Sequence, residues 1–197
     1  TYGNAFMLRT DSDKKLNEFK KYSSIPIING LSPSSHPTQV LSDIFTIQEI
    51  KKKNVSKLKL CWIGDANNNM MNSLIESCVK FSISLNIACP KKYQPNKGLI
   101  SWIKKEKGKI KIFNKKEIAV KNCDVVVTDK IISMNDKVNK KKKLKSFKNF
   151  KVDSKTMSLA KKDAIFLHCL PRGSEVTTDV FLGKQSKVWQ QALNRLY

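Results

Sequence analysis

Residues 58–88 carry the clearest fold signal in the chain and read LKLCWIGDANNNMMNSLIESCVKFSISLNIA. Residues 58–63 are apolar except for Lys59, and a polar turn occupies 64–69. Apolar residues then recur at helical spacing as far as Phe81, and a second strand pattern, with Leu85, Ile87 and Ala88 apolar, follows at 84–88. This order predicts a strand, a helix and a parallel strand, the unit of a doubly wound sheet. Because ligands collect at the carboxyl ends of such strands, the turn is a candidate site.

The same alternation continues toward the C-terminus. The predicted elements are helices at 96–107, 153–163 and 185–196 and strands at 109–113, 124–129 and 164–168. The lysine run at 140–143 is expected in a solvated loop. The recurrence predicts an α/β fold, a doubly wound and mostly parallel sheet with helices on both faces.

The first 53 residues have a different pattern, and we expect them to be the tail of a preceding α/β domain. The opening segment 1–10 and the run at 25–28 are predicted to be buried strands. Turn formers follow, and Pro37 suits the first position of a helix of about four turns, which ends at the lysine run 51–53.

The chain has 38 Lys and Arg residues against 16 Asp and Glu residues, a formal net charge of +22. Such a charge by itself suggests a polyanion partner. However, the excess is mostly Lys, is spread along the chain and lacks the aromatic residues that single-strand binders interleave with basic ones. We therefore predict no nucleic-acid partner. No apolar run is long enough to suggest a membrane span.

Cysteine and histidine give no metal-ligand pattern. The five cysteines are odd in number and scattered, and His36 and His168 are far apart in sequence. These features predict a reducing, cytoplasmic environment and neither a structural metal nor a disulfide framework.

Polar residues at the start of two predicted helices are candidates for ligand binding. His36 and Gln39 lie in the first turn of a helix, where free N–H groups favour an anion or a polarised carbonyl. The alternative is that His36 caps the helix and Gln39 is solvated. The turn 64–69 lacks a GxGxxG motif, which disfavours nucleotide binding, and Asn68 is equally consistent with simple turn formation.

Candidates also follow the later strands. Asp129 and Ser133 offer a carboxylate and a hydroxyl, which suit the ammonium group of a zwitterionic ligand. Cys169 follows the strand 164–168, and it either meets a substrate amine or is a small buried hydrophobe. Arg195, on its own, is more typical of a solvated charge.

In this order, the segments resemble the ornithine carbamoyltransferase family over essentially the whole chain. The matching segments are PIINGL at 26–31, HPTQ at 36–39, GDANN at 64–68, Asp129 with SM at 133–134, HCLP at 168–171 and NR at 194–195. The resemblance implies a cofactor-free transferase that moves the carbamoyl group of carbamoyl phosphate to the δ-amine of L-ornithine, giving L-citrulline and phosphate in arginine metabolism.

The resemblance also implies the residue roles. The residues implied to contact carbamoyl phosphate are Arg9, His36, Gln39, Cys169, Leu170 and Arg195. Of these, Arg9, His36, Cys169 and Arg195 are implied to be catalytic. The residues implied to hold ornithine are Asn68, Asp129, Ser133 and Met134. Asn135 departs from the family, which usually has Gly after the Ser-Met pair.

The domain organisation implied by the resemblance divides the chain at residue 53. Residues 1–53 correspond to the end of the carbamoyl-phosphate-binding domain with the interdomain helix, and residues 54–197 to the ornithine-binding domain. A phosphate-binding loop is expected upstream of Thr1 and a helix after Tyr197. We therefore expect this chain to be inactive alone. The resemblance also implies that the complete enzyme is a homotrimer.

Two other functions remain open from the sequence. One is a carbamoyltransferase that acts on a modified ornithine or a diamine. The other is a non-catalytic, basic relative that binds polyanions, which the charge of +22 would favour.

Overall fold

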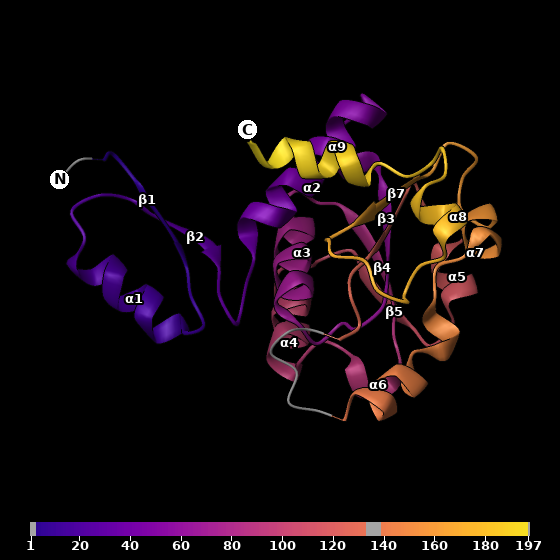
Figure 1. Cartoon of the computed structure of the whole chain (residues 1–197), viewed down its shortest axis with the longest axis horizontal. Coiled ribbons are helices and arrows are strands. Elements are labelled where there is room, and N and C mark those ends of the chain that lie inside the picture. The colour runs from indigo at the N-terminus through magenta and orange to yellow at the C-terminus, as the bar shows by residue number, and fades with distance from the viewer. Residues whose placement is uncertain (1–2, 133–138, 197) are drawn as a thin grey trace.

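The computed structural model describes residues 3–132 and 139–196, arranged as a small N-terminal lobe beside a larger α/β unit (Figure 1). In the lobe, β1 (Phe6–Arg9) and β2 (Ile27–Leu31) form a parallel pair, and α1 (Asp13–Tyr22) connects them. The long helix α2 (Pro37–Lys51) leads from the lobe to the α/β unit.

The α/β unit is built on a five-stranded parallel sheet with the order β5-β4-β3-β6-β7. Its strands are β3 (Lys59–Ile63), β4 (Ser84–Ala88), β5 (Ile110–Phe113), β6 (Val125–Thr128) and β7 (Ile165–His168). Its α-helices are α3 (Asn69–Lys80), α4 (Lys97–Lys105), α5 (Lys116–Val120), α6 (Lys140–Ser146), α7 (Ser154–Ser158), α8 (Thr178–Phe181) and α9 (Val188–Leu193). Short 3₁₀ helices are η1 (Val55–Lys57), η2 (Lys91–Tyr93), η3 (Lys148–Phe150) and η4 (Asn194–Leu196).

Each face of the sheet is covered by its own apolar core, which confirms the predicted fold class. Residues of α2, α3 and α4 pack on one face around Leu60 and Trp62 of β3. Residues of α5, α7 and α8 pack on the other face around Cys61 and Ile63. The strand order reverses between β3 and β6, so the crevice for a ligand is expected at their carboxyl ends.

The lysine run at 140–143 was expected in a loop, and this prediction is wrong. The run begins α6, whose first turn is capped by Asn139: its side-chain oxygen accepts a hydrogen bond from the backbone N–H of Lys142 at 3.1 Å. Lysine is a good helix former, so a cap is enough to start a helix here. Lys143 is buried, unlike its neighbours.

Two predicted helices are shorter than the sequence suggested. The helix expected over 153–163 ends at Ser158. The helix expected over 185–196 begins only at Val188, because the preceding residues hydrogen-bond along β7. There, the N–H of Phe166 donates to the carbonyl of Gln185, and the N–H of Lys187 donates to the carbonyl of Phe166.

The strands of the lobe were expected to be buried, and they are not. Phe6 and Met7 of β1 are 45% and 59% exposed. A sheet of two strands with one helix has too few layers to cover both of its faces.

The helix α1 itself was not predicted; it begins where the Ser12 hydroxyl accepts from the N–H of Lys15 at 3.3 Å. Among the described residues, no helix combines the length and apolar character needed to cross a bilayer.

Candidate functional site

A cavity of about 340 Å³ lies where the lobe meets the carboxyl ends of the large sheet. Every described residue that the sequence singled out lines it: Arg9, His36, Gln39, Asn68, Asp129, Cys169, Leu170 and Arg195. These residues come from the ends of β1, β6 and β7, the first turns of α2 and α3, and η4. The predicted Ser133 and Met134, like Asn135, fall outside the described residues.

The lining of the cavity includes two arginines close to His36. Arg9 ends β1 and Arg195 lies in η4, and both line the cavity with His36. Burial, reinforced by the charges of Arg195 and then Arg9, lowers the pKa of His36 to about 4. At neutral pH the imidazole is therefore uncharged, and it can donate a hydrogen bond from one nitrogen.

His36 occupies the N-cap position of α2, but its side chain makes no capping hydrogen bond. The alternative that it serves as the helix cap is therefore not observed. Instead, its backbone N–H donates to the hydroxyl of Ser73 in α3 at 2.8 Å. Two asparagines of α3, Asn69 and Asn72, donate to loop carbonyls just before His36, each at 2.9 Å. Helix α3 thus fixes the loop that presents the imidazole.

Arg195 is exposed, as the sequence alone favoured, but it also lines the cavity. Its guanidinium donates to the side-chain oxygen of Gln39, so η4 and α2 meet at the cavity wall. The side-chain nitrogen of Gln39 in turn donates to Asp43 at 2.9 Å.

Asn68 lines the cavity and also caps α3. Its side-chain oxygen accepts from the N–H of Met71 at 2.8 Å, and its side-chain nitrogen donates to the carbonyl of Asp65 at 3.1 Å. The carboxamide is therefore held by the turn, and contact with a ligand stays a prediction.

Replacing Asn68 by alanine is expected to lower the free energy of unfolding by about 1 kcal/mol, because the N–H of Met71 loses its cap. The comparison is Asn67→Ala, which removes a neighbouring exposed carboxamide and should change stability by less than about 0.5 kcal/mol. Urea titration of both variants measures the difference, and equal losses would rule out the capping role.

The lining of the cavity also includes a buried acid, Asp129. Asp129 directly follows β6, and burial raises its pKa to about 7, with nearby Glu175 and Asp43 adding to the rise. Burial, followed by the charges of Asp43 and Asp129, raises the pKa of the Cys169 thiol well above its usual value. The thiol is therefore protonated at neutral pH, and a protonated thiol is a poor nucleophile.

Sequence reasoning missed a buried ion pair beneath the turn at 64–69. The ammonium of Lys143 lies 2.7 Å from the carboxylate of Asp65, and the two side chains are only 5% and 6% exposed. The same ammonium lies 5.7 Å from the ring centre of Tyr93. Asp65 also accepts from the N–H of Asn67 at 2.9 Å, so the pair orders the turn. Nothing in a run of lysines identifies the one that faces inward.

A second buried pair lies behind Cys169. The ring nitrogen Nε2 of His168 is 2.8 Å from the carboxylate of Glu175, and both side chains are almost fully buried. Glu175 is seven residues away, beyond a loop, and no local sequence signal links the two. Among the described residues, no group of three or more His, Cys, Asp or Glu side chains is arranged to hold a metal.

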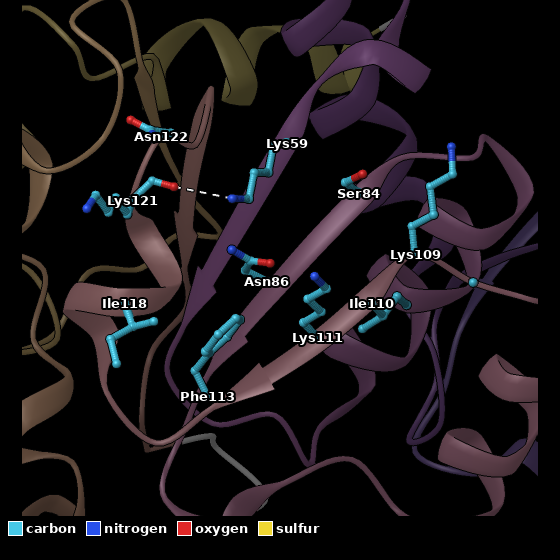
Figure 2. Close-up of a pocket in the computed structure, with 11 residues that line it drawn as sticks. Lys59, Ser84, Asn86, Lys109, Ile110, Lys111, Phe113, Ile118, Lys121 and Asn122 are labelled. Atoms are coloured by element: carbon cyan, nitrogen blue, oxygen red, sulfur yellow. Dashed lines mark hydrogen bonds between the residues drawn. The ribbon is translucent and has the colours of Figure 1, made fainter.

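A larger depression, of about 630 Å³, lies at the opposite, amino end of the strands (Figure 2). Lysines and amides line it, among them Lys59 at the start of β3 and Asn86 in β4. In Figure 2, the ammonium of Lys59 donates to the carbonyl of Lys121 at 3.3 Å. The lining of this depression contains none of the acids, imidazoles or thiols found in the first cavity. The first cavity is therefore the better candidate for a site of chemistry.

Comparison with known proteins matches two family models. The carbamoyl-P binding domain of aspartate/ornithine carbamoyltransferase matches residues 1–49, and the Asp/Orn binding domain of the same family matches residues 56–197. The predicted boundary at residue 53 lies between the two matches and stays a prediction.

The relatives carry the same name. A curated ornithine carbamoyltransferase of Caldicellulosiruptor saccharolyticus is 44% identical over 203 residues, covering 100% of this chain and 65% of the relative. One of Ruthia magnifica is 42% identical and covers 97% of this chain and 63% of the relative. The chain thus spans less than two thirds of the length of these relatives.

The similar solved structures are also ornithine carbamoyltransferases. The anabolic ornithine carbamoyltransferase of Campylobacter jejuni aligns with a TM-score of 0.92 at 40% identity, covering 100% of this chain and 66% of that one. The ornithine carbamoyltransferase of Pyrococcus furiosus aligns with a TM-score of 0.89 at 37% identity, covering 99% of this chain and 64% of that one. With both domain models matched and the fold shared, the chain belongs to the aspartate/ornithine carbamoyltransferase family.

Proposed function

We propose that the complete protein transfers the carbamoyl group of carbamoyl phosphate to the δ-amine of L-ornithine, releasing L-citrulline and phosphate. One observation carries the proposal. Eight residues from well-separated segments of the sequence line a single cavity, which brings together two arginines and the buried carboxylate of Asp129. A phosphate-bearing donor and an amino-acid acceptor need these opposite charges.

In this proposal the two arginines and His36 bind carbamoyl phosphate. Arg9 and Arg195 pair with phosphate oxygens, and neutral His36 donates to the carbamoyl oxygen. The carboxamide of Gln39, the thiol of Cys169 and the carbonyl of Leu170 surround the carbamoyl group. Donors held in place before reaction stabilise the negative charge that develops on the carbamoyl oxygen and on the departing phosphate.

In the same proposal, ornithine binds at Asp129. Asp129 pairs with the α-ammonium group, and Asn68, Ser133 and the backbone of Met134 complete the contacts. The δ-amine then attacks the carbamoyl carbon, and the tetrahedral intermediate collapses with loss of phosphate. The amine must be uncharged to attack. The reaction is accelerated mainly because the two bound reactants are held in the orientation that the attack requires.

A chimera provides the first test. It joins residues 1–197 to the segments by which the Campylobacter jejuni relative is longer, so that its cavity comes from this chain. Calorimetry should show ornithine binding in the presence of phosphonoacetamide, a stable carbamoyl phosphate analogue. Putrescine, a diamine without the α-amino acid group, should bind much more weakly. Equal binding of the two would favour a diamine acceptor instead.

Ornithine binding by this chimera is expected to strengthen as pH rises through about 7, because Asp129, whose pKa burial raises to about 7, must ionise to attract the ammonium. The carboxyl is mostly protonated at pH 6 and mostly ionised at pH 8, so Kd should fall by about tenfold over that range. In Asp129→Asn, which cannot ionise, calorimetry should give a weak and flat profile. A wild-type profile that is equally flat would contradict the role of Asp129.

We also propose, from family membership, that the complete protein is a homotrimer acting in arginine metabolism in the cytoplasm, and that the domain boundary lies at residue 53. Sedimentation of the chimera tests the assembly. A monomer at micromolar concentration would argue against the trimer.

A second candidate, polyanion binding, is favoured by the lysine-lined depression in Figure 2. Lys59, Lys109, Lys111 and Lys121 line it, and its lining includes no carboxylate. Binding of a random oligonucleotide that weakens steeply with salt, and that is lost when Lys109 and Lys111 are replaced by Gln, would support this function. Weak binding that is insensitive to this double replacement would contradict this function, and the net positive charge would then only reflect lysines on solvated surfaces.

A further inference from the structure

Different partners fix the two ends of the Gln39 carboxamide. Its nitrogen Nε2 donates to Oδ1 of Asp43 at 2.9 Å, and its oxygen Oε1 accepts from the guanidinium of Arg195. An arginine can only donate hydrogen bonds, and an ionised aspartate can only accept them. The two partners therefore allow one orientation of the amide, with the oxygen toward Arg195 and the cavity.

Asp43 is itself held in place. It is 1% exposed, and the same Oδ1 accepts from Nε2 of Gln191 in α9 at 2.6 Å. The oxygen of Gln191 accepts from the backbone N–H of His168 at 2.9 Å, one residue before Cys169. Oδ2 of Asp43 is buried without a hydrogen-bond partner among the described residues. Asp43 thus connects α2 and α9 with the end of β7 through one oxygen.

We propose that Asp43 is a positioning residue that keeps the oxygen of Gln39 facing the cavity, and thereby selects a carbamoyl group over an acyl group of the same shape. The inference rests on the proposed function. A carbonyl oxygen accepts two hydrogen bonds, so Oε1 can take one from Arg195 and one from the NH₂ of a carbamoyl group. A methyl group in place of that NH₂ leaves the oxygen without its second donor.

The orientation of Gln39 is testable in the 197-residue chain without ligand or substitution. Nuclear Overhauser contacts should connect the Nε2 protons of Gln39 with the β protons of Asp43. Contacts with the side chain of Arg195 in their place would overturn the proposal, because the amide would then be reversed.

The selectivity is testable with two probes that differ only in NH₂ against CH₃, phosphonoacetamide and acetonylphosphonate. The chimera with the wild-type residues 1–197 should prefer phosphonoacetamide by about tenfold, the effect of one neutral hydrogen bond. Asp43→Leu, which offers Gln39 no acceptor, should reduce the preference to less than about threefold. Asp43→Asn should keep it, because its oxygen can take the place of Oδ1.

Glu49→Leu is the matched control. Glu49 is also on α2 and accepts from two amides near the C-terminus, those of Gln190 at 3.1 Å and Asn194 at 3.0 Å, but it does not contact Gln39. Its removal should leave the preference unchanged. An unchanged preference in Asp43→Leu, or an equal loss in Glu49→Leu, would overturn the proposal. If neither probe shifts the resonances of His36 and Arg195, the carbamoyl phosphate site fails, and the selective role with it, whatever the orientation of Gln39.

Discussion

Replacing Asp129 by alanine is expected to weaken ornithine binding by the chimera at least about 100-fold. The change removes the carboxylate of a largely desolvated charge pair, a loss that typically costs about 3 kcal/mol or more, and 1.4 kcal/mol is a factor of ten in Kd. Asp129 has no basic side chain of the described chain as an ion-pair partner, so its carboxylate remains available to a ligand cation. Calorimetric titration with ornithine, in the presence of phosphonoacetamide, measures the effect.

Two comparisons make that result specific. Asp11→Ala removes an exposed carboxylate whose partner is the exposed Lys15, and it should leave the Kd unchanged. The affinity of Asp129→Ala for phosphonoacetamide should also stay within about threefold of wild type, since Asp129 is assigned to the acceptor side. A similar loss for both ligands would mean that Asp129 holds the fold of the cavity rather than ornithine.

Replacing Lys143 by methionine is expected to lower the free energy of unfolding of the 197-residue chain by about 3–5 kcal/mol. Methionine preserves much of the side-chain length but removes the ammonium, which leaves the carboxylate of Asp65 buried without its cation. The loss of one partner of a buried pair costs more than the intact pair contributes, because the remaining charge stays desolvated. The midpoint of urea unfolding, read together with its slope, measures the change.

Lys141→Met is the matched control, because Lys141 lies in the same helix α6 but is exposed. It should change stability by less than about 0.5 kcal/mol. If the two variants lose equal stability, helix propensity rather than the buried pair would account for the effect.

The sequence predicted most of the fold because the large sheet is made of local signals. Strand β4 was predicted with its observed bounds, since a short segment with alternating apolar residues between a helix and a proline permits few alternatives. Helix α2 was predicted from Pro37 and the helical spacing that follows it. The exposure of β1 was not predicted, because a strand rich in apolar residues has the same sequence pattern whether or not further layers cover it.

The candidate site was predicted where a residue stands at the end of an element. His36, Asp129 and Cys169 all directly precede a helix or follow a strand, and parallel strands bring such ends together. Lys143 and Glu175 were missed because their roles depend on partners that only the folded chain brings close. Asp43 was missed for the same reason: it reads as one polar position on an amphipathic helix.

The formation of citrulline by the chimera tests the central claim most directly. With carbamoyl phosphate and ornithine supplied, we predict L-citrulline and phosphate in equal amounts, lost in the Asp129→Ala variant of the same chimera. A folded chimera that binds phosphonoacetamide but forms no citrulline from ornithine would contradict the assignment of ornithine as the acceptor.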